Sequence, residues 1–285
     1  MDDAHRLTVC LSFDLDAVSF WTTTLRSVSP SDISRGEFGP RTAMPRILDL
    51  LAAHGVPATF FVPAVTARQF PATVHAAVAA GHEIGSHGDM HERLTGLERA
   101  DEERVLRRSV EVLEDIAGTR PRGFRAPAWE LSPNTIGLLE DLGIEYDSSQ
   151  FATDFEPYRA RRGDRVVDGE WAPGPESAVW EIPVAWELDD FPAFFLRPPH
   201  FTMGRPTEDV YRGWVDEYEY ALGNAPGGVF TLTMHPEVIG RGPRLAILDR
   251  FIEHVSRRAD VGFARMGAVA EALSSDQTTS SQEGI

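Results

Sequence analysis

The sequence predicts an α/β protein built on a parallel sheet or barrel. Three times between residues 41 and 149, a segment with apolar residues at helical spacing is followed by a glycine and then by a short β-rich run. This alternation of helix and strand is typical of parallel strands, and the length of 285 residues suits a single α/β barrel. We therefore expect one domain at 1–273 and a disordered tail at 274–285, where few apolar residues remain to pack.

The predicted elements begin with a strand at 7–13, LTVCLSF, which is short, apolar and uncharged. Residues 17–40 show no clean period and predict a long loop that could hold a short helix. The three helix–glycine–strand units end in the runs VPATFFV, HEIGSH and IEYDSS, and in the third unit Ser132 is the expected N-cap with Pro133 at the first helical position. An amphipathic helix at 97–117 and a strand within RGFRAPAW lie between the second and third units.

Residues 150–205 interrupt this alternation of helix and strand. They form an insertion rich in proline and aromatic residues, with a strand expected at 179–184. The sequence leaves open whether the insertion is a lid over a site or a subunit interface in a homo-oligomer. Beyond it the pattern predicts a helix at 207–222, the strand GGVFTLTMHP, a helix at 244–257, the strand VGFARM and a last short helix.

Composition limits the partners and the compartment. The 44 acidic residues outnumber the 27 basic ones, and a net charge of -17 repels nucleic acid and anionic membrane surfaces. No run approaches the roughly 18 apolar residues of a membrane span, and the start MDDAHRLTVC lacks the features of a secretory signal, so we expect a cytoplasmic protein. The single cysteine, Cys10, lies in an apolar run and is expected to be a buried thiol.

Ionisable residues follow five of the predicted strands. In a barrel of parallel strands the carboxyl ends meet at one rim, where such barrels carry their active sites. A capping aspartate, a core histidine or a solvated arginine would explain any one of these residues but not all of them together. The sequence therefore predicts a site at this rim, formed by Asp14, Asp16, His87, His91, Arg125, Asp147 and His235.

Two of these residues have the spacing of metal ligands. His87 and His91 are four apart, which on a helix would put both imidazoles on one face and let them share an ion about 2 Å from each. By itself this spacing is weak, because the chain contains nine histidines and such a pair can arise by chance.

Five motifs in order resemble those of the polysaccharide deacetylase family of carbohydrate esterases. They are FDLDA at 13–17, SHGDMH at 86–91, RAPAW at 125–129, DSS at 147–149 and TMHPE at 233–237, and the resemblance spans about residues 7–270. It implies a single-domain distorted barrel of the (β/α)7 type. It also implies a hydrolase of amide C–N bonds other than peptide bonds.

The resemblance assigns a role to each strand-end residue. It implies one divalent metal ion, expected to be zinc, held by Asp16, His87 and His91. Asp14 would be the catalytic base and His235 the catalytic acid. Arg125 would orient the base, and Asp147 would hold Arg125 in turn.

The first motif and the insertion depart from the commoner family pattern. Leu15 separates the two aspartates, and this D-x-D form, together with WELDDFPAF at 186–194, resembles a subgroup of peptidoglycan deacetylase-like and allantoinase or cyclic imidase-like members. We expect removal of acetyl groups from N-acetylated saccharides. The alternatives are a cyclic imide or ureide amidohydrolase acting on small cytoplasmic substrates, and an inactive barrel that only binds saccharide.

Four further residues are candidates for substrate binding. Trp129 and Trp186 would either stack on a sugar ring or belong to the core. Asp189 and Asp190 would either line the cleft or lie in a solvated loop.

Overall fold

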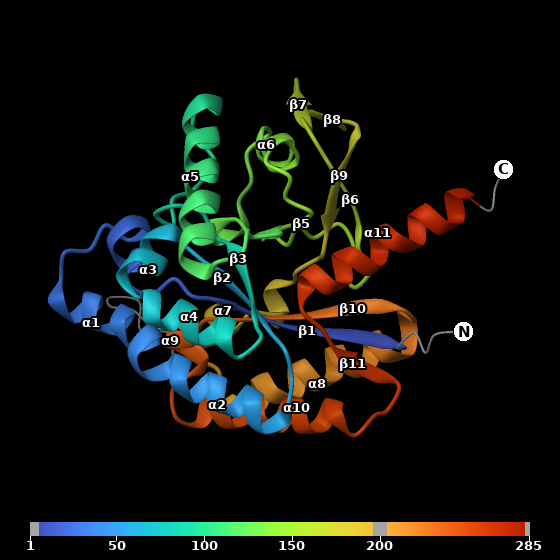
Figure 1. Cartoon of the computed structure of the whole chain (residues 1–285). Helices are drawn as coiled ribbons and strands as arrows, with labels where there is room; N and C mark the ends of the chain where they lie inside the picture. Colours follow the sequence, from blue (N-terminus) through green and yellow to red (C-terminus); the bar gives the residue numbers. More distant parts are fainter. Residues whose placement is uncertain (1–5, 196–203, 283–285) are drawn as a thin grey trace.

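The structure is a computed structural model, and it describes residues 6–195 and 204–282, with side chains described as far as Asp276. A curled, nine-stranded sheet organises the chain (Figure 1). The series β10-β1-β2-β3-β4-β5-β9 is parallel throughout, which confirms the predicted α/β class and the distorted barrel. Its members are β1 (Leu7–Asp14), β2 (Thr59–Val62), β3 (Glu83–Ser86), β4 (Gly123–Phe124), β5 (Tyr146–Asp147), β9 (Glu176–Glu181) and β10 (Gly228–Met234).

Strand β1 is the centre of this sheet. It pairs with β10 along nearly its whole length, with β2 at its carboxyl end, and with β11 (Val261–Phe263) at its beginning. Val9, Leu11 and Phe13 are fully buried in the main core, as expected for a central parallel strand. Cys10 is also buried, and burial raises the pKa of its thiol, in agreement with the expected structural role.

Helices cover the sheet and line its ends. In Figure 1, α2, α8 and α10 lie below β1 and β10, and α5 and α6 lie above them. The α-helices are α1 (Pro30–Phe38), α2 (Met44–His54), α3 (Ala64–Gln69), α4 (Pro71–Ala79), α5 (Arg99–Ala117), α6 (Thr135–Asp141), α7 (Asp190–Phe194), α8 (Thr207–Asn224), α9 (Pro236–Ile239), α10 (Pro243–Ser256) and α11 (Met266–Gln282). Shorter turns of helix are η1 (Phe20–Thr24), η2 (Gly39–Ala43), η3 (Pro127–Trp129) and η4 (Trp186–Leu188).

The insertion contains more regular structure than expected. β6 (Tyr158–Arg161) pairs antiparallel with β9, and β7 (Arg165–Val167) forms a separate hairpin with β8 (Glu170–Ala172). After β9, the chain returns to the sheet, because Asp189 forms a parallel bridge with Thr233 of β10. The parallel series has β9 at one edge and β10 at the other. The bridge therefore places the segment that follows β9 beside the carboxyl end of β10. Part of the predicted insertion, 196–203, lies outside the described residues.

Two local expectations need correction. Helix α6 begins at Thr135 with Asn134 as its N-cap, whereas we expected Ser132 and Pro133 in those positions. The Ser132 hydroxyl accepts a hydrogen bond from the Asn134 N–H but donates its own proton to buried Glu102, so it ties α6 to α5. At the other end of the chain, α11 continues to Gln282 through the segment expected to be a disordered tail from residue 274, and 283–285 lie outside the described residues.

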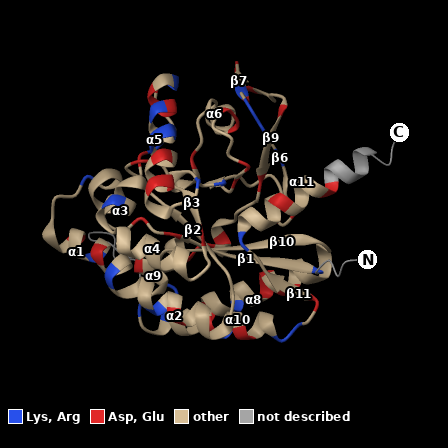
Figure 2. Cartoon of the chain, in the orientation of Figure 1, with Lys and Arg blue, Asp and Glu red and all other residues tan. Residues whose placement is uncertain are grey.

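Charge is distributed over the outside of this fold. Figure 2 shows acidic and basic residues along the outer helices, α5 among them, while β1 and β10 carry few. Within the described residues, no helix combines the length and apolar character needed to cross a membrane.

Candidate functional site

The predicted strand-end residues come together as expected. Asp14 is the last residue of β1, and His87, Arg125 and His235 directly follow β3, β4 and β10. Asp14, His87 and His235 line a cavity of about 300 Å³, here called the strand-end pocket. Predicted residues that line it are Asp14, Asp16, His87, His91, Trp129, Trp186, Asp189 and His235, whereas Arg125, Asp147 and Asp190 lie behind its wall.

Asp16 lies between the two histidines. Its Oδ1 is 3.3 Å from Nε2 of His87, and its Oδ2 is 3.3 Å from Nε2 of His91. All three side chains are buried, and their ligand-type atoms lie within 4.8 Å of one another. Burial alone would raise the pKa of Asp16, but the two imidazoles lower it well below its ordinary value, so the carboxylate is charged.

Hydrogen bonds at the far side of each ring determine which nitrogen is free. Nδ1 of His87 donates to the carbonyl oxygen of Arg125 at 2.7 Å, so Nδ1 carries a proton and Nε2 is the nitrogen that faces Asp16. Nδ1 of His91 is 2.7 Å from Oγ1 of Thr24, whose hydroxyl donates to the His91 carbonyl, so this ring has the same tautomer. Such outer hydrogen bonds are typical of histidines that bind metal. Thr24 carried no signal in the sequence.

The two histidines are on a loop, which corrects the expected helical arrangement. The residues from His87 to His91 follow β3 without helical structure, and the loop turns through Gly88 at φ 77° and His91 at φ 62°. The imidazole rings nevertheless lie 5.0 Å apart between centroids. Buried Asp89 holds this loop in place through ion pairs with Arg68 at 3.1 Å and Arg108 at 3.3 Å.

Arg125 holds Asp14 as expected. The guanidinium is fully buried, and its Nη1 donates to Oδ1 of Asp14 at 2.8 Å and to Oγ of Ser12 at 2.9 Å. Its Nε and Nη2 donate to the backbone oxygen and the hydroxyl of Ser148, both at 2.9 Å, and its plane lies over Phe61. The second carboxylate oxygen of Asp14 is turned toward the pocket, 3.9 Å from Nε2 of His87.

Asp147 does not hold Arg125, so that expectation is wrong. Ser148, the next residue, makes both contacts to the guanidinium, and Asp147 accepts a hydrogen bond from the hydroxyl of Ser149 at 2.8 Å. The alternation of side chains along the strand turns Asp147 away from Arg125 and toward buried Glu181 of β9. Burial raises the pKa of both carboxyl groups, and the charge of Asp147 raises that of Glu181 further.

His235 is held from behind by Asp190. Oδ1 of Asp190 accepts hydrogen bonds from Nδ1 of His235 at 2.9 Å and from its backbone N–H at 3.0 Å. Asp190 is fully buried and does not line the cleft, which corrects the expectation for this residue. Burial opposes the charged imidazole, but Asp189 and Asp190 outweigh it and raise the pKa of His235 well above its ordinary value.

Asp189 reaches the strand-end pocket, as expected for one of the cleft residues. Its Oδ1 is 3.5 Å from Nδ1 of His235 and accepts a hydrogen bond from the backbone N–H of Phe191 at the start of α7. Burial raises the pKa of Asp189 to about 7, although the charge of His235 opposes this shift.

Trp129 and Trp186 form an aromatic wall at the mouth of the pocket. Their rings lie 4.2 Å apart between centroids at an interplanar angle of 30°, and Phe151 extends the group. Trp129 is nearly buried, whereas Trp186 is 47% exposed, so the wall reaches from the interior to the surface. Trp129 and the preceding Ala128 both have φ 56°, a costly conformation for such residues that clusters at functional sites.

Comparisons of sequence and structure with known proteins point to one family. The sequence profile of polysaccharide deacetylases matches residues 37–146. The peptidoglycan deacetylase of Helicobacter pylori is 33% identical over 282 residues, covering 94% of this chain and 96% of that protein. A Mycobacterium smegmatis protein described as a polysaccharide deacetylase has a similar structure, with a TM-score of 0.86, 33% identity, and coverage of 97% of this chain and 93% of that one.

The structure of Puue allantoinase also resembles this fold, with a TM-score of 0.77, 24% identity, and coverage of 95% and 91% of the two chains. At that identity the similarity concerns the fold alone. The long matches at 33% identity carry more weight, and they indicate the same family that the five ordered motifs resemble. The chain therefore belongs to the polysaccharide deacetylase family.

Proposed function

We propose that this hydrolase of amide C–N bonds removes acetyl groups from N-acetylated saccharides and that it requires one divalent cation, expected to be zinc. The observation that carries the proposal is the convergence of Asp16, His87 and His91 on one point, with Asp14 and His235 lining the same pocket. The Helicobacter pylori relative, named as a peptidoglycan deacetylase, supports this substrate class.

The residues around Asp16 fit a cation. Oδ1 of Asp16 is buried without a hydrogen-bond partner in the described structure, and a buried carboxylate oxygen in that state is costly unless an ion contacts it. One carboxylate and two neutral imidazoles are a donor set that zinc accepts. When bound, such a cation supplies Lewis acidity, which activates water and polarises a carbonyl oxygen.

Asp14 is suited to take a proton from water. Arg125 occupies Oδ1 and fixes the orientation of the carboxylate, while Oδ2 faces the pocket. A water molecule between Oδ2 and a substrate carbonyl would lose its proton to Asp14 as it attacks.

His235 is suited to protonate the leaving nitrogen. The carboxylates of Asp189 and Asp190 favour the charged imidazole, and Asp190 fixes Nδ1, so the proton on Nε2 is presented to the pocket 4.0 Å from Oδ2 of Asp16. An amine leaves poorly without a proton, so an acid at this position completes the reaction.

The aromatic wall favours a sugar over a small cyclic amide. Trp186 is half exposed beside Phe151, and together they extend the pocket outward, which suits a substrate longer than one ring. Hydrolysis of a cyclic imide or ureide remains the second candidate, since the D-x-D motif is compatible with it. An inactive barrel is disfavoured because each ionisable group of the proposed mechanism is present.

The localisation and the oligomeric state stay predictions.

The test is a direct comparison of two reactions on the purified protein after its metal content is measured. We expect about one divalent ion per chain and release of acetate from an N-acetylglucosamine oligomer, with little opening of a cyclic imide. His87→Ala should lose the ion, and Asp14→Asn and His235→Ala should each lower kcat by about 100-fold or more without losing it.

A matched control is His75→Ala, because His75 lies on α4 outside the strand-end pocket. Faster turnover of the cyclic imide than of the oligomer would favour the second candidate. Full deacetylase activity in all three site variants would refute the mechanism.

A further inference from the structure

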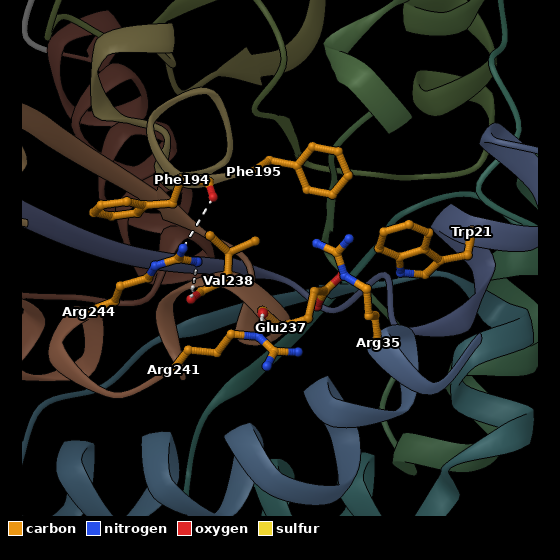
Figure 3. Close-up of a pocket in the computed structure, with 8 residues that line it drawn as sticks. All are labelled: Trp21, Arg35, Phe194, Phe195, Glu237, Val238, Arg241 and Arg244. Atoms are coloured by element: carbon orange, nitrogen blue, oxygen red, sulfur yellow. Dashed lines mark hydrogen bonds between the residues drawn. The ribbon is translucent and has the colours of Figure 1, made fainter. Parts of the chain in front are cut away.

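A second cavity, of about 330 Å³, lies between α1, α9 and α10 (Figure 3). We call it the arginine pocket, because Arg35, Arg241 and Arg244 contribute their guanidinium groups to its lining. Such a concentration of positive charge is unusual in a protein whose net charge is -17. The proposed deacetylation does not use this cavity.

The guanidinium groups of Arg241 and Arg244 are held in place by the backbone. Nε of Arg241 donates to the carbonyl oxygen of Glu237 at 2.9 Å, and Arg244 donates to those of Val238 and Phe194, both at 3.2 Å. In the part of the chain that the structure describes, neither side chain forms an ion pair with a carboxylate. Each keeps further N–H groups for a ligand, since a guanidinium has five.

The three positive charges act on one another. Burial and the charges of Arg35 and Arg244 lower the pKa of Arg241, and burial and Arg35 lower that of Arg244 in spite of Asp190. Arginine stays charged under such shifts, so the pocket holds mutual repulsion that an anion would relieve.

Glu237, which also lines the pocket, has an unusual environment. It is buried, and neither of its carboxyl oxygens has a hydrogen-bond partner among the described residues. Burial and the charge of Asp16 raise its pKa well above the ordinary value, whereas the charge of His235 opposes this shift. Even when charged, Glu237 offsets only one of the three guanidinium groups, so the lining of the arginine pocket keeps an excess of positive charge.

An aromatic partition separates the arginine pocket from the strand-end pocket. Phe20 and Phe191 line the strand-end pocket, and Trp21 and Phe195 line the arginine pocket. The rings of Phe191 and Phe195 stack at 4.2 Å, and the Phe20 and Phe195 rings meet edge to face at 5.5 Å. The two pockets are therefore separate binding volumes that share one wall.

We propose that the arginine pocket binds a phosphate group, either as free phosphate or as a phosphate monoester. Guanidinium groups match the geometry and charge of phosphate, and three of them, from α1, the turn after α9 and the start of α10, surround one space. The cavity has room for the phosphate and for part of an ester group. This site does not depend on the proposed deacetylase activity.

The experiment is calorimetric titration of the metal-loaded protein with inorganic phosphate, and in a second series with glucose 6-phosphate, at constant ionic strength maintained with chloride. We expect one site, with affinity falling about 10-fold or more in Arg241→Gln and in Arg35→Gln. The control Arg107→Gln changes an exposed arginine on α5 and should bind as the wild type does.

A third variant distinguishes this site from phosphate binding at a metal ion. His91→Ala removes a proposed metal ligand and should keep phosphate binding. Loss of binding in His91→Ala together with full binding in Arg241→Gln would overturn the proposal, and so would the absence of binding to either phosphate compound in the wild type.

A measurement on the wild-type protein covers the case in which the arginine variants do not fold. Phenylglyoxal modifies accessible arginines, and mass spectrometry identifies the modified residues. We expect phosphate, but not an equal ionic strength of chloride, to protect Arg35 and Arg241 while Arg107 reacts as before. Equal modification of Arg241 with and without phosphate would contradict the proposal.

Discussion

At the scale of single residues, each reactive side chain of the strand-end pocket is kept in place by a buried neighbour. Asp14 is oriented by Arg125, and Arg125 is oriented by Ser12 and Ser148, all of them buried. His235 is held in the same way by Asp190. A buried ion pair of this kind is costly to break, because the remaining partner is left charged and unpaired.

The first prediction concerns Asp190. Asp190→Asn should lower kcat by roughly 10-fold to 100-fold, because His235 loses a carboxylate that fixes Nδ1 and favours the charged ring. The pKa of His235 should fall with the loss of that charge. Activity that requires a protonated His235 would then be lost at lower pH, so the alkaline limb of the kcat profile should move down.

The measurement is a pH–rate profile of wild type and variant, with Asp154→Asn as the control, since Asp154 is exposed. A lower kcat with an unmoved alkaline limb would show that Asp190 acts on structure alone.

At the scale of elements, the loop after β3 and the short helix η1 form one unit. His91 lies on the loop and Thr24 ends η1, and they exchange two hydrogen bonds although 67 residues separate them. The ring of Phe20, at the start of η1, also meets the His91 ring edge to face. The segment between β1 and α2, which the sequence predicts only as a long loop, therefore positions a proposed metal ligand.

The second prediction tests this unit. Thr24→Val has nearly the same shape but cannot accept the hydrogen bond from Nδ1 of His91, so the affinity for the metal ion should fall about 10-fold to 100-fold. Competition with a chelator measures this affinity. The control Thr22→Val changes a threonine of the same helix whose hydroxyl bonds only to the Val18 carbonyl in the described structure, and it should bind metal normally.

At the scale of the whole molecule, stability depends on a buried acid pair between β5 and β9. Asp147 and Glu181 both have raised pKa values, chiefly because they are buried and, for Glu181, because Asp147 is charged. A raised pKa means that the folded protein keeps a proton that the unfolded chain loses. This contribution to stability is complete below the unfolded pKa and is lost as the pH rises through the folded value.

The third prediction follows from that sign. Glu181→Gln resembles the protonated acid and can still accept the hydrogen bonds from the Ser149 and Gln150 N–H groups, so its melting temperature should fall less than that of the wild type as the pH is raised from 6 to 9. Thermal denaturation at several pH values measures the difference. Glu170→Gln, at an exposed position of β8, should follow the wild type. Parallel curves for all three proteins would contradict the raised pKa of Glu181.

The order of apolar runs and polar residues along the chain was sufficient to predict the parallel strands and the residues that meet at their ends. Apolar runs and glycines predicted the strands of the parallel series, and the rule that strand ends meet at one rim predicted that Asp14, Asp16, His87 and His235 would share a pocket. Contacts that depend on side-chain direction were not accessible. A shift of one position decides that Ser148 and not Asp147 contacts Arg125, and no pattern in the sequence connects Thr24 to His91.

The pairing of β1 decides which parts of this barrel are most constrained. This strand is paired on both sides and along its length, so Asp14 and Asp16 depend on the most constrained strand, whereas β4 and β5 have two residues each. We expect amides of β1 to exchange with deuterium last and those near β4 and β5 earlier. Substitutions at Trp129 and Trp186 can then alter which compound is accepted, as long as Arg125 and Ser148, which follow β4 and β5, keep Asp14 in its orientation.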